Sequence, residues 1–391
     1  DDVESRGLGD VYKRQDIAIT DPDFKYPSLW KSNIAADYKF GDGWVATIEL
    51  LYSKDINAIY HDNIGLYRTE QFVNDGGAGN ARPYYNGYYS DREGNQKAAN
   101  HVVMLRNTSK GHSLYTTFQL QKNFVDGILK GLYLNGSYSF GQSRGVTDGT
   151  SSVATSAWKY RAALDGNAEE VGYTAGSFDG RLLLSASYTA NWSKYAATSF
   201  GLIYQRYRPF RYSYCYNGDA NGDSQFSNDL MYIPANFDEV KDHLLPGDFD
   251  SQEDAWKAMN AFIEQDPYLS KHRGEYAERN GAVAPFANQL DLSVSHDIKI
   301  YQKNGRSHTL RFSFNIANFL NLLNRNWGVV QTTVLGNQQY QFLTIPKGQG
   351  PSAANNYTLK YTMAKDLDET FKDNLNDVSR WQMQFGIKYI F

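Results

Sequence analysis

The end of the chain constrains the fold most strongly. From Trp381 to Phe391 every odd position is large and apolar, while the even positions are mostly Gln, Gly and Lys. A period of two predicts a strand with one apolar face and one polar face. Aromatic rings at both ends of such a face suit the two interfaces of a bilayer, although an edge strand of a soluble β-sandwich has a similar pattern. The residues expected to face lipid include Trp381, Phe385, Tyr389 and Phe391.

Composition supports a membrane strand more than a membrane helix. The chain has 391 residues with 30 Tyr, 21 Phe and 7 Trp, yet it contains no run of 18 apolar residues. A helix needs such a run to cross a bilayer, whereas a barrel strand exposes only alternate residues to lipid. The net charge of −4 gives no reason to expect a nucleic-acid partner. The single cysteine, Cys215, excludes an internal disulfide and a cysteine metal cluster.

The same alternation recurs along the chain and predicts nine strands in total, beginning near Trp30. Short turns and long loops alternate between these strands, as they do in outer-membrane barrels, and a compact soluble domain rarely has four loops of this length. The short turns are expected at 41–43, 123–128, 193–196 and 301–307, and the long loops at about 55–101, 142–179, 209–285 and 318–379. The predicted fold is all-β, a transmembrane antiparallel β-barrel with about nine spanning strands.

An odd strand number indicates only part of a barrel. Bacterial single-chain barrels have an even number of strands, and an open sheet in lipid would leave unpaired edge groups at several kcal/mol each. The chain also starts without a signal peptide. Residues 10–15 look like the translation of a transposase sequencing adaptor. We therefore expect residues 1–15 to be foreign to the protein and residues 16–391 to be the C-terminal part of a larger barrel.

Several segments together resemble the C-terminal barrel of TonB-dependent outer-membrane receptors of the Bacteroidetes type, the group with a carboxypeptidase-regulatory-like N-terminal domain. Each segment alone is a weak signal, but they extend over almost the whole chain from Trp30. The segments are 30–38, 49–55, 214–223, 228–234, 318–328 and 381–391.

The resemblance implies a barrel of about 22 strands filled by an N-terminal plug and energised by the TonB complex. It implies a receptor in the bacterial outer membrane that imports a nutrient such as a glycan, a peptide or a metal chelate, and no enzymatic activity. The implied partners are membrane lipid and lipopolysaccharide, the plug, TonB and the nutrient. A passive porin-like channel and a structural or adhesive outer-membrane protein are the alternatives.

One loop has the side chains of a calcium site. Oxygen-bearing residues alternate from Asp219 onward, and Ca²⁺ needs many hard oxygen ligands at once. The pattern departs from an EF-hand, with Ser224 in place of the sixth-position Gly and Leu230 in place of the last Glu. A solvated Asp/Asn turn is the alternative. The candidate ligands of a structural Ca²⁺ are Asp219, Asn221, Asp223, Gln225 and Asp229.

Aromatic and basic residues gather in the predicted outer loops. Exposed rings could stack on sugars or clamp peptide side chains, and arginine could hold a carboxylate with two hydrogen bonds. An aromatic girdle with loop packing is the alternative. The candidate substrate-binding residues are Tyr84, Tyr85, Tyr88, Tyr89, Arg208, Arg211 and Tyr212.

Catalytic patterns are weak. Residues 141–145 match G-x-S-x-G, but a nucleophile elbow needs a strand before it and a helix after it, and here a loop rich in Ser, Gly and Thr follows. No H-E-x-x-H pattern occurs. The charged residues on predicted strands are expected to face the barrel interior by their parity; they are Glu49, Asp291, Asp297 and Arg311.

Overall fold

The computed structural model describes most of the chain from Asp16 to Phe391. The described residues are 16–73, 82–88, 101–149, 151–301, 307–335, 339–351, 359–361 and 369–391. The segment 1–15, predicted to be foreign to the protein, and the candidate residue Tyr89 lie outside them.

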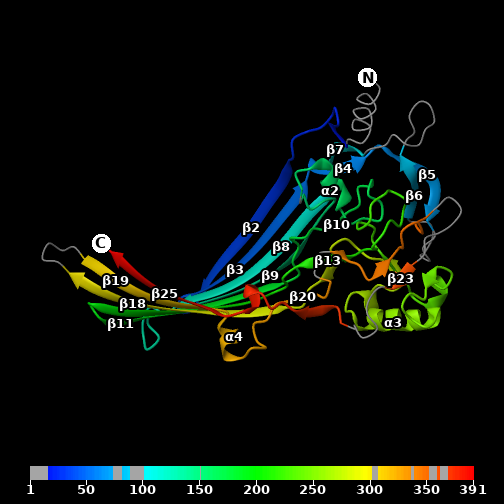
Figure 1. The fold of residues 1–391 in the computed structure, drawn as a ribbon. Helices are drawn as coiled ribbons and strands as arrows, with labels where there is room; N and C mark the ends of the chain where they lie inside the picture. The colour runs from blue at the N-terminus through cyan, green and yellow to red at the C-terminus, as the bar shows by residue number, and fades with distance from the viewer. Residues whose placement is uncertain are drawn as a thin grey trace, which may run out of the picture.

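Nine long antiparallel strands form one curved sheet, which we call the main sheet (Figure 1). The spatial order of the strands follows the chain, so the main sheet is a continuous meander with no crossover. In order, they are β2 (Leu29–Phe40), β3 (Trp44–Asp55), β8 (Gly111–Asn123), β9 (Leu132–Gly145), β11 (Arg181–Ser193), β12 (Ala196–Tyr207), β18 (Ala287–Tyr301), β19 (Ser307–Ala317) and β25 (Gln382–Ile390). The all-β class and the nine predicted strands are confirmed.

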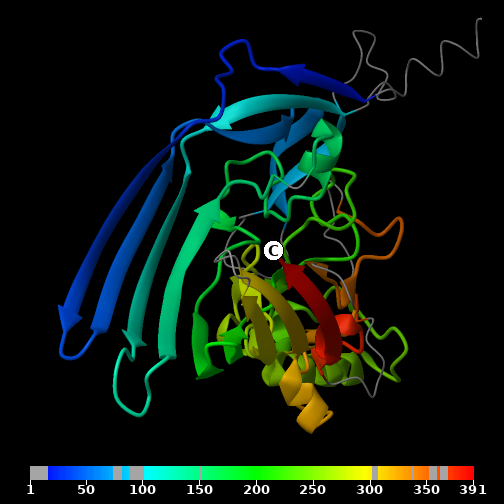
Figure 2. The same cartoon turned by 90° about the vertical axis from the view of Figure 1, so that its left-hand side faces the viewer.

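The two outermost strands of the main sheet lie at opposite sides of the curved wall (Figure 2). Among the described residues β2 pairs only with β3, and β25 pairs only with β19. The part of the sheet that the structure describes is therefore an open arc.

Regular register, interrupted only by a shift between Asn191 and Ser193 in the β11–β12 pair, keeps like side chains together on each face of the main sheet. Ile48 pairs with Phe118, and Phe118 pairs with Tyr138. Phe314 pairs with Phe385 in the same way at the other side of the sheet. Since side chains alternate along a strand, one face collects the apolar residues and the other collects the polar ones.

Turn length differs sharply between the two ends of the main sheet. The β2–β3 turn is only 41–43, with Gly41 at φ 51° and Gly43 at φ 83°, backbone angles that glycine adopts without strain. The β11–β12 turn is shorter still, at 194–195. The long connections 56–110, 146–180, 208–286 and 318–381 all join strands at the opposite end. Short and long connections therefore alternate between the long strands along the chain.

The segments expected to be loops have secondary structure of their own. Most of their short strands form small sheets, whereas β10 pairs with β9 of the main sheet, and α3 is a 14-residue helix. Strand β1, which precedes the first long strand, pairs with β7. The strands are β1 (Ile17–Thr20), β4 (Ala58–Asn63), β5 (Leu66–Val73), β6 (Arg82–Tyr88), β7 (Val102–Thr108), β10 (Gly172–Tyr173), β13 (Arg211–Tyr214), β14 (Tyr232–Ile233), β15 (Leu244–Leu245), β16 (Glu275–Tyr276), β17 (Ala282–Val283), β20 (Gln331–Thr333), β21 (Gln339–Tyr340), β22 (Leu343–Thr344), β23 (Leu359–Tyr361) and β24 (Phe371–Asp373). The helices are α2 (Ala154–Lys159), α3 (Gln252–Gln265), α4 (Phe319–Leu323), η1 (Phe237–Glu239), η2 (Leu269–Lys271) and η3 (Asp377–Ser379).

We call the described residues of 56–110, 146–180, 208–286 and 339–371 the connection body, since they gather at one end of the main sheet (Figure 1). Its core contains Tyr214, Met231, Phe262 and Tyr340, all at most 1% exposed, and no residue of the nine long strands belongs to this core. Helix α3 is capped at its N-terminus by Ser251, whose side chain accepts a hydrogen bond from Asp254 N. Within the described residues, no helix combines the length and apolar character of a membrane span.

Candidate functional site

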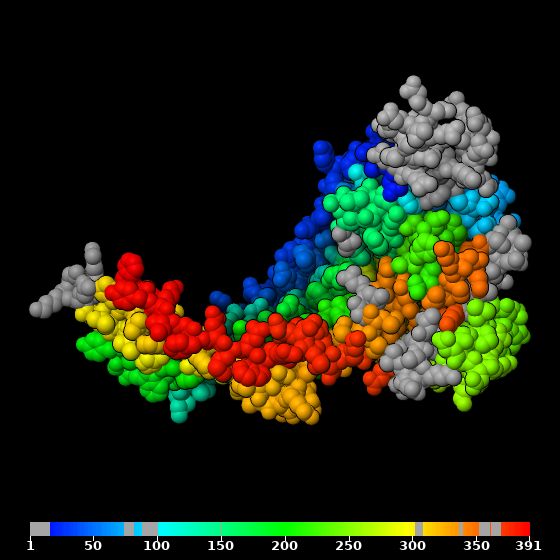
Figure 3. All heavy atoms as spheres, viewed as in Figure 1, coloured from blue at the N-terminus to red at the C-terminus, as the bar shows by residue number. Residues whose placement is uncertain are grey.

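The apolar face of the main sheet is uncovered among the described residues. Ile34 is 69% exposed, Phe385 65% and Ile387 62%, and each points to this face by register. The space-filling view shows the main sheet as a thin wall beside the much thicker connection body (Figure 3). An apolar area of this extent marks a surface that meets lipid or another protein.

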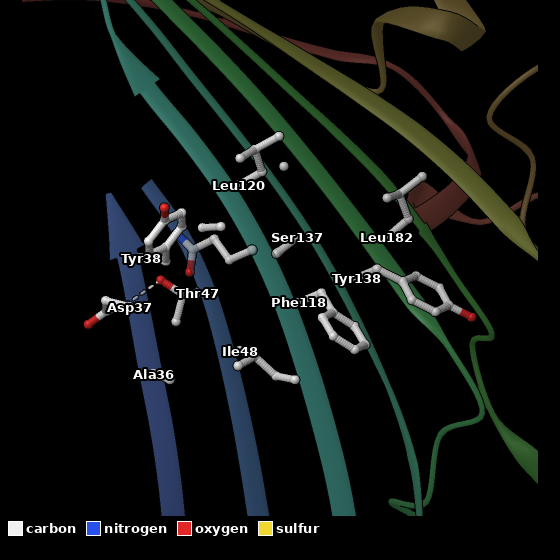
Figure 4. Close-up of a pocket in the computed structure, with 13 residues that line it drawn as sticks. Ala36, Asp37, Tyr38, Thr47, Ile48, Phe118, Leu120, Ser137, Tyr138 and Leu182 are labelled. Atoms are coloured by element: carbon white, nitrogen blue, oxygen red, sulfur yellow. Dashed lines mark hydrogen bonds between the residues drawn. The ribbon is translucent and has the colours of Figure 1, made fainter. Parts of the chain in front are cut away.

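This apolar face also has a shallow hollow of about 710 Å³. Small residues such as Ala36 and Gly136 leave room at its base, while Ile48, Phe118 and Tyr138 line its sides (Figure 4). The lining side chains come from five neighbouring strands, β2, β3, β8, β9 and β11. The hollow therefore belongs to the apolar face and is not a separate enclosed site.

Aromatic residues stand near both ends of the apolar face. Trp44 and Tyr52 are eight residues apart on β3, and Trp381 and Tyr389 are eight apart at β25. Eight residues of strand span about 27 Å, which becomes close to 20 Å across a sheet tilted by about 40°. Near the short turns, Phe40 stacks on Trp44 with ring centroids 6.4 Å apart. The apolar face thus has an aromatic rim near each of its two ends.

On the opposite face of the main sheet, polar side chains of neighbouring strands form hydrogen bonds with one another. Asn33 donates to Glu49 at 2.8 Å, and Gln119 donates to Asn135 at 2.9 Å. Arg311 forms two hydrogen bonds with Asp297, at 2.6 and 2.8 Å. All four charged residues predicted to face the interior by parity lie on this polar face; they are Glu49, Asp291, Asp297 and Arg311.

The predicted substrate-binding tyrosines lie inside the connection body. Tyr84 and Tyr212 are 7% and 1% exposed and belong to its core. Tyr85 is 2% exposed, and its hydroxyl donates to Asp165 at 2.7 Å. Tyr88 lies at the end of β6. In this conformation Tyr84, Tyr85 and Tyr212 offer little surface to a ligand.

The two predicted arginines are also engaged by their surroundings. Arg211 is 6% exposed and donates to the carbonyls of Ser177 and Asn280. Arg208 donates to the Ala284 carbonyl at 2.7 Å, and its guanidinium lies over the Phe286 ring, 4.2 Å from the centroid. The Arg211–Ser177 contact joins two connections, and the other contacts lie within the 208–286 connection.

The predicted calcium loop brings its three aspartates together. Ligand oxygens of Asp219, Asp223 and Asp229 all lie within 4.8 Å of one another. The loop folds this way because its side chains cap its own backbone: Asp219 accepts from Gly222 N at 2.6 Å, and Asp223 accepts from Gln225 N at 2.8 Å. Gly222 has φ 82°, and a Cβ there would lie 2.1 Å from the Tyr85 carbonyl. We call these three aspartates the acidic cluster.

The other two predicted ligands have different roles. Asn221 accepts a hydrogen bond from Asp223 N at 2.9 Å, and its amide nitrogen lies 3.4 Å from the Asp223 carboxylate. Gln225 is buried, and its backbone N–H, which bonds to Asp223, is the part that contacts the cluster. The structure therefore brings together the aspartates of the predicted ligand set.

Burial gives the acidic cluster unusual electrostatics. Burial and the nearby Asp219 carboxylate raise the pKa of Asp223 to about 7. Burial and the Asp223 carboxylate raise the pKa of Asp229 well above its usual range. Arg82, fully buried, lies 3.2 Å from Asp229 and opposes this effect. Among the described residues, the three carboxylates of the cluster outnumber the one guanidinium that pairs with them.

Sequence reasoning missed two members of this site. Arg82 contacts Asp229 across 147 positions of sequence, a pairing that spacing cannot predict. Asn228 is 1% exposed, and its side chain hydrogen-bonds to Asp223. Asn228 precedes Asp229 directly, so the run of polar residues was its only sequence signal. The G-x-S-x-G segment lies inside or at the end of strand β9, not at a strand–helix turn.

Comparison of this chain with protein-family models, with curated proteins and with solved structures gives no match.

Proposed function

We propose that the chain is the C-terminal part of a TonB-dependent outer-membrane receptor barrel that takes up a nutrient. The observation on which the membrane proposal depends is the uncovered apolar face of the main sheet between two aromatic rims. In water such a face would favour aggregation, whereas in a bilayer lipid chains cover it and the rings lie at the interfaces.

The polar face supports a barrel more than a flat sheet between two lipid layers. Pairs such as Asn33–Glu49 and Arg311–Asp297 need water or polar neighbours, and a barrel interior provides them. The open edges at β2 and β25 would be costly in lipid. The proposal therefore includes further strands that pair with these edges and close the barrel.

The connection body supports a receptor within the class of outer-membrane barrels. All four long connections lie at one end of the sheet, and three of them (56–110, 208–286 and 318–381) share a packed core, so they form a structured entrance. The resemblance of the segments 214–223, 228–234 and 318–328 to Bacteroidetes-type receptors supports energy-coupled uptake in particular. We propose transport rather than catalysis.

A pair of variants tests the membrane proposal. Phe385→Lys places a charge at the middle of the apolar face, while the neighbouring Gln384→Lys places the same charge on the polar face. We expect Phe385→Lys to reduce assembly into lipid vesicles strongly and Gln384→Lys to assemble like the unaltered chain. Equal assembly of both variants would contradict the proposal.

Uptake by cells separates a receptor from a channel. In a strain that has lost the chromosomal gene, we expect uptake of the cognate nutrient to fall, and restoration by the full gene to require the proton gradient. Restored uptake that persists with a protonophore would indicate a passive channel. Normal uptake with lost surface attachment would indicate an adhesive protein.

A further inference from the structure

The acidic cluster has an amide oxygen that lacks a partner. Asn228 is 1% exposed, and no described residue donates a hydrogen bond to its Oδ1. The same amide hydrogen-bonds to the Asp223 carboxylate through its nitrogen. The oxygen and nitrogen of an amide exchange places when it turns over, so a half-turn would point Oδ1 at the cluster. Two ionised carboxylates and an amide oxygen repel one another, and a cation between them would make that arrangement favourable.

Charge balance indicates the valence of the missing partner. Among the described residues, the three carboxylates contribute −3 when ionised and Arg82, which pairs with Asp229, contributes +1, which leaves −2 in a largely buried space. Buried charge is tolerated when it is paired or binds a metal. One divalent cation would neutralise this excess.

The spacing suits calcium. Calcium–oxygen distances are about 2.3–2.6 Å, so ligands on opposite sides of one ion are about 5 Å apart. The carboxylate oxygens of the cluster lie within 4.8 Å of one another and fit inside that shell. Asp219 is the most accessible of the three aspartates and provides the entry side, because Asp223 and Asp229 are fully buried. Carboxylate and amide oxygens are the hard ligands that calcium prefers.

The loop that carries the cluster also contacts the β5–β6 ribbon, which is distant in sequence. Tyr85 N donates to the Asn221 carbonyl at 2.7 Å. Arg82 contacts both the Asp229 carboxylate and the Leu230 carbonyl. The conformation of the acidic loop is therefore linked directly to the position of strand β6.

We propose that Asp219, Asp223, Asp229 and the Oδ1 of Asn228 bind one calcium ion, which fastens the β5–β6 ribbon to the 217–231 loop. The ion replaces repulsion between the carboxylates with shared coordination, so it stabilises the junction of two connections. This inference is independent of the proposed function, because every ligand lies in the connection body.

Terbium luminescence tests the site on the whole chain, folded in detergent and freed of metal with a chelator. Trp158 lies close enough to the site to sensitise the Tb³⁺ emission. Its ring and the Asp223 carboxylate both border Gly166, since a Cβ built on Gly166 would be 3.5 Å from Trp158 Nε1 and 3.5 Å from Asp223 Oδ2. We expect saturable Tb³⁺ emission at one ion per chain, and displacement by Ca²⁺ at concentrations at least 10-fold lower than by Mg²⁺. No saturable emission, together with no Ca²⁺-dependent shift in Tm up to millimolar Ca²⁺, would overturn the proposal.

Variants assign the ligands. Asp223→Asn should weaken Ca²⁺ binding at least 10-fold, whereas Asp242→Asn, an exposed residue of the same connection, should leave it unchanged. Asn228→Ala should weaken binding, and Asn228→Asp should retain or strengthen it. Equal binding by Asp223→Asn and the unaltered chain would overturn the site.

Folding of the variants is checked in the chelator. Asp223→Asn removes a buried charge, so its Tm without metal should equal or exceed that of the unaltered chain, while the Ca²⁺-dependent rise in Tm is lost. If Asp223→Asn fails to fold, Asn228→Ala and Asn228→Asp decide the matter, since they keep all three carboxylates. Equal Ca²⁺ affinity of those two variants and the unaltered chain would then overturn the assigned role of Asn228.

Discussion

Phe385 and Phe262 are the same residue in opposite surroundings. Phe385 lies on the apolar face of the main sheet and is 65% exposed, while Phe262 lies in the core of the connection body and is 1% exposed. The connection body buries its apolar residues against one another, as soluble domains do. The main sheet gathers its apolar residues on an outer surface, which is favourable only if something apolar covers them.

Polar groups differ between the two regions in the same way. On the main sheet they pair across strands on a face that is partly open, as Arg311 and Asp297 do. In the connection body they are buried and connected, as where Asp266 accepts from the hydroxyls of Tyr214 and Thr370. A low-dielectric interior makes each of these bonds costly to lose. The two regions therefore differ in which side chains they bury and which they expose, and this difference can be tested.

The largest expected effect comes from removing an aromatic ring. Phe262→Ala should destabilise the connection body by about 3–5 kcal/mol, because it opens a cavity among fully packed residues. Phe385→Ala should cost far less, because its ring has few protein neighbours to lose. Urea unfolding in detergent, followed by protease resistance of the connection body, measures both. Similar losses of stability for the two variants would contradict the proposed difference in packing between the two regions.

The second largest loss of stability is expected from a charge placed on the apolar face of strand β25. In lipid, Phe385→Lys should cost about 2–4 kcal/mol near the membrane midplane, and Gln384→Lys should cost little. Reversible unfolding from lipid vesicles measures the difference. If the larger cost fell on Gln384→Lys, the polar face would have to be the lipid-facing one.

Removing a hydroxyl compares the two regions with the smallest change in shape. Tyr214→Phe should cost about 1–3 kcal/mol, because it removes the 2.6 Å hydrogen bond to buried Asp266. Tyr38→Phe on the main sheet, where the side chain is 70% exposed, serves as the matched control and should be near neutral. Chemical unfolding of both variants in the same detergent is the measurement. A neutral Tyr214→Phe would mean that another donor replaces the hydroxyl.

The smallest effect is expected from the ion pair on the polar face. Arg311→Gln should cost about 0.2–1 kcal/mol, because Arg311 is 43% exposed and solvent screens its attraction to Asp297. Unfolding at low and high salt should show the cost shrinking as salt rises. A cost of several kcal/mol that does not depend on salt would place this pair in a much drier environment.

Much of the main sheet could be predicted from sequence, because strand periodicity is a local property. Ile48, Phe118 and Phe385 reveal their face through alternation alone, and the short turns carry glycine signals such as Gly41 and Gly43. The aspartates of the acidic cluster were also predictable, since the residues that cap the loop lie close together in sequence.

The connection body could be predicted only in its position along the chain. Its core joins Tyr84, Tyr214, Phe262 and Tyr340, which are tens to hundreds of residues apart and follow no shared period. The tyrosines and arginines predicted to meet a ligand show the consequence: aromatic and basic composition suggested exposure, but long-range packing placed Tyr85 and Arg211 inside.

The sequence alone determined which face of each strand is apolar, because alternation within a strand depends only on neighbouring residues. Only the tertiary structure decided what surrounds the acidic cluster. Arg82 reaches Asp229 from another connection, and Asn228 turns toward Asp223, through contacts that chain topology creates. The periodicity of a strand is visible in a few consecutive residues, whereas the burial and charge balance of a site depend on which distant segments of the chain come into contact.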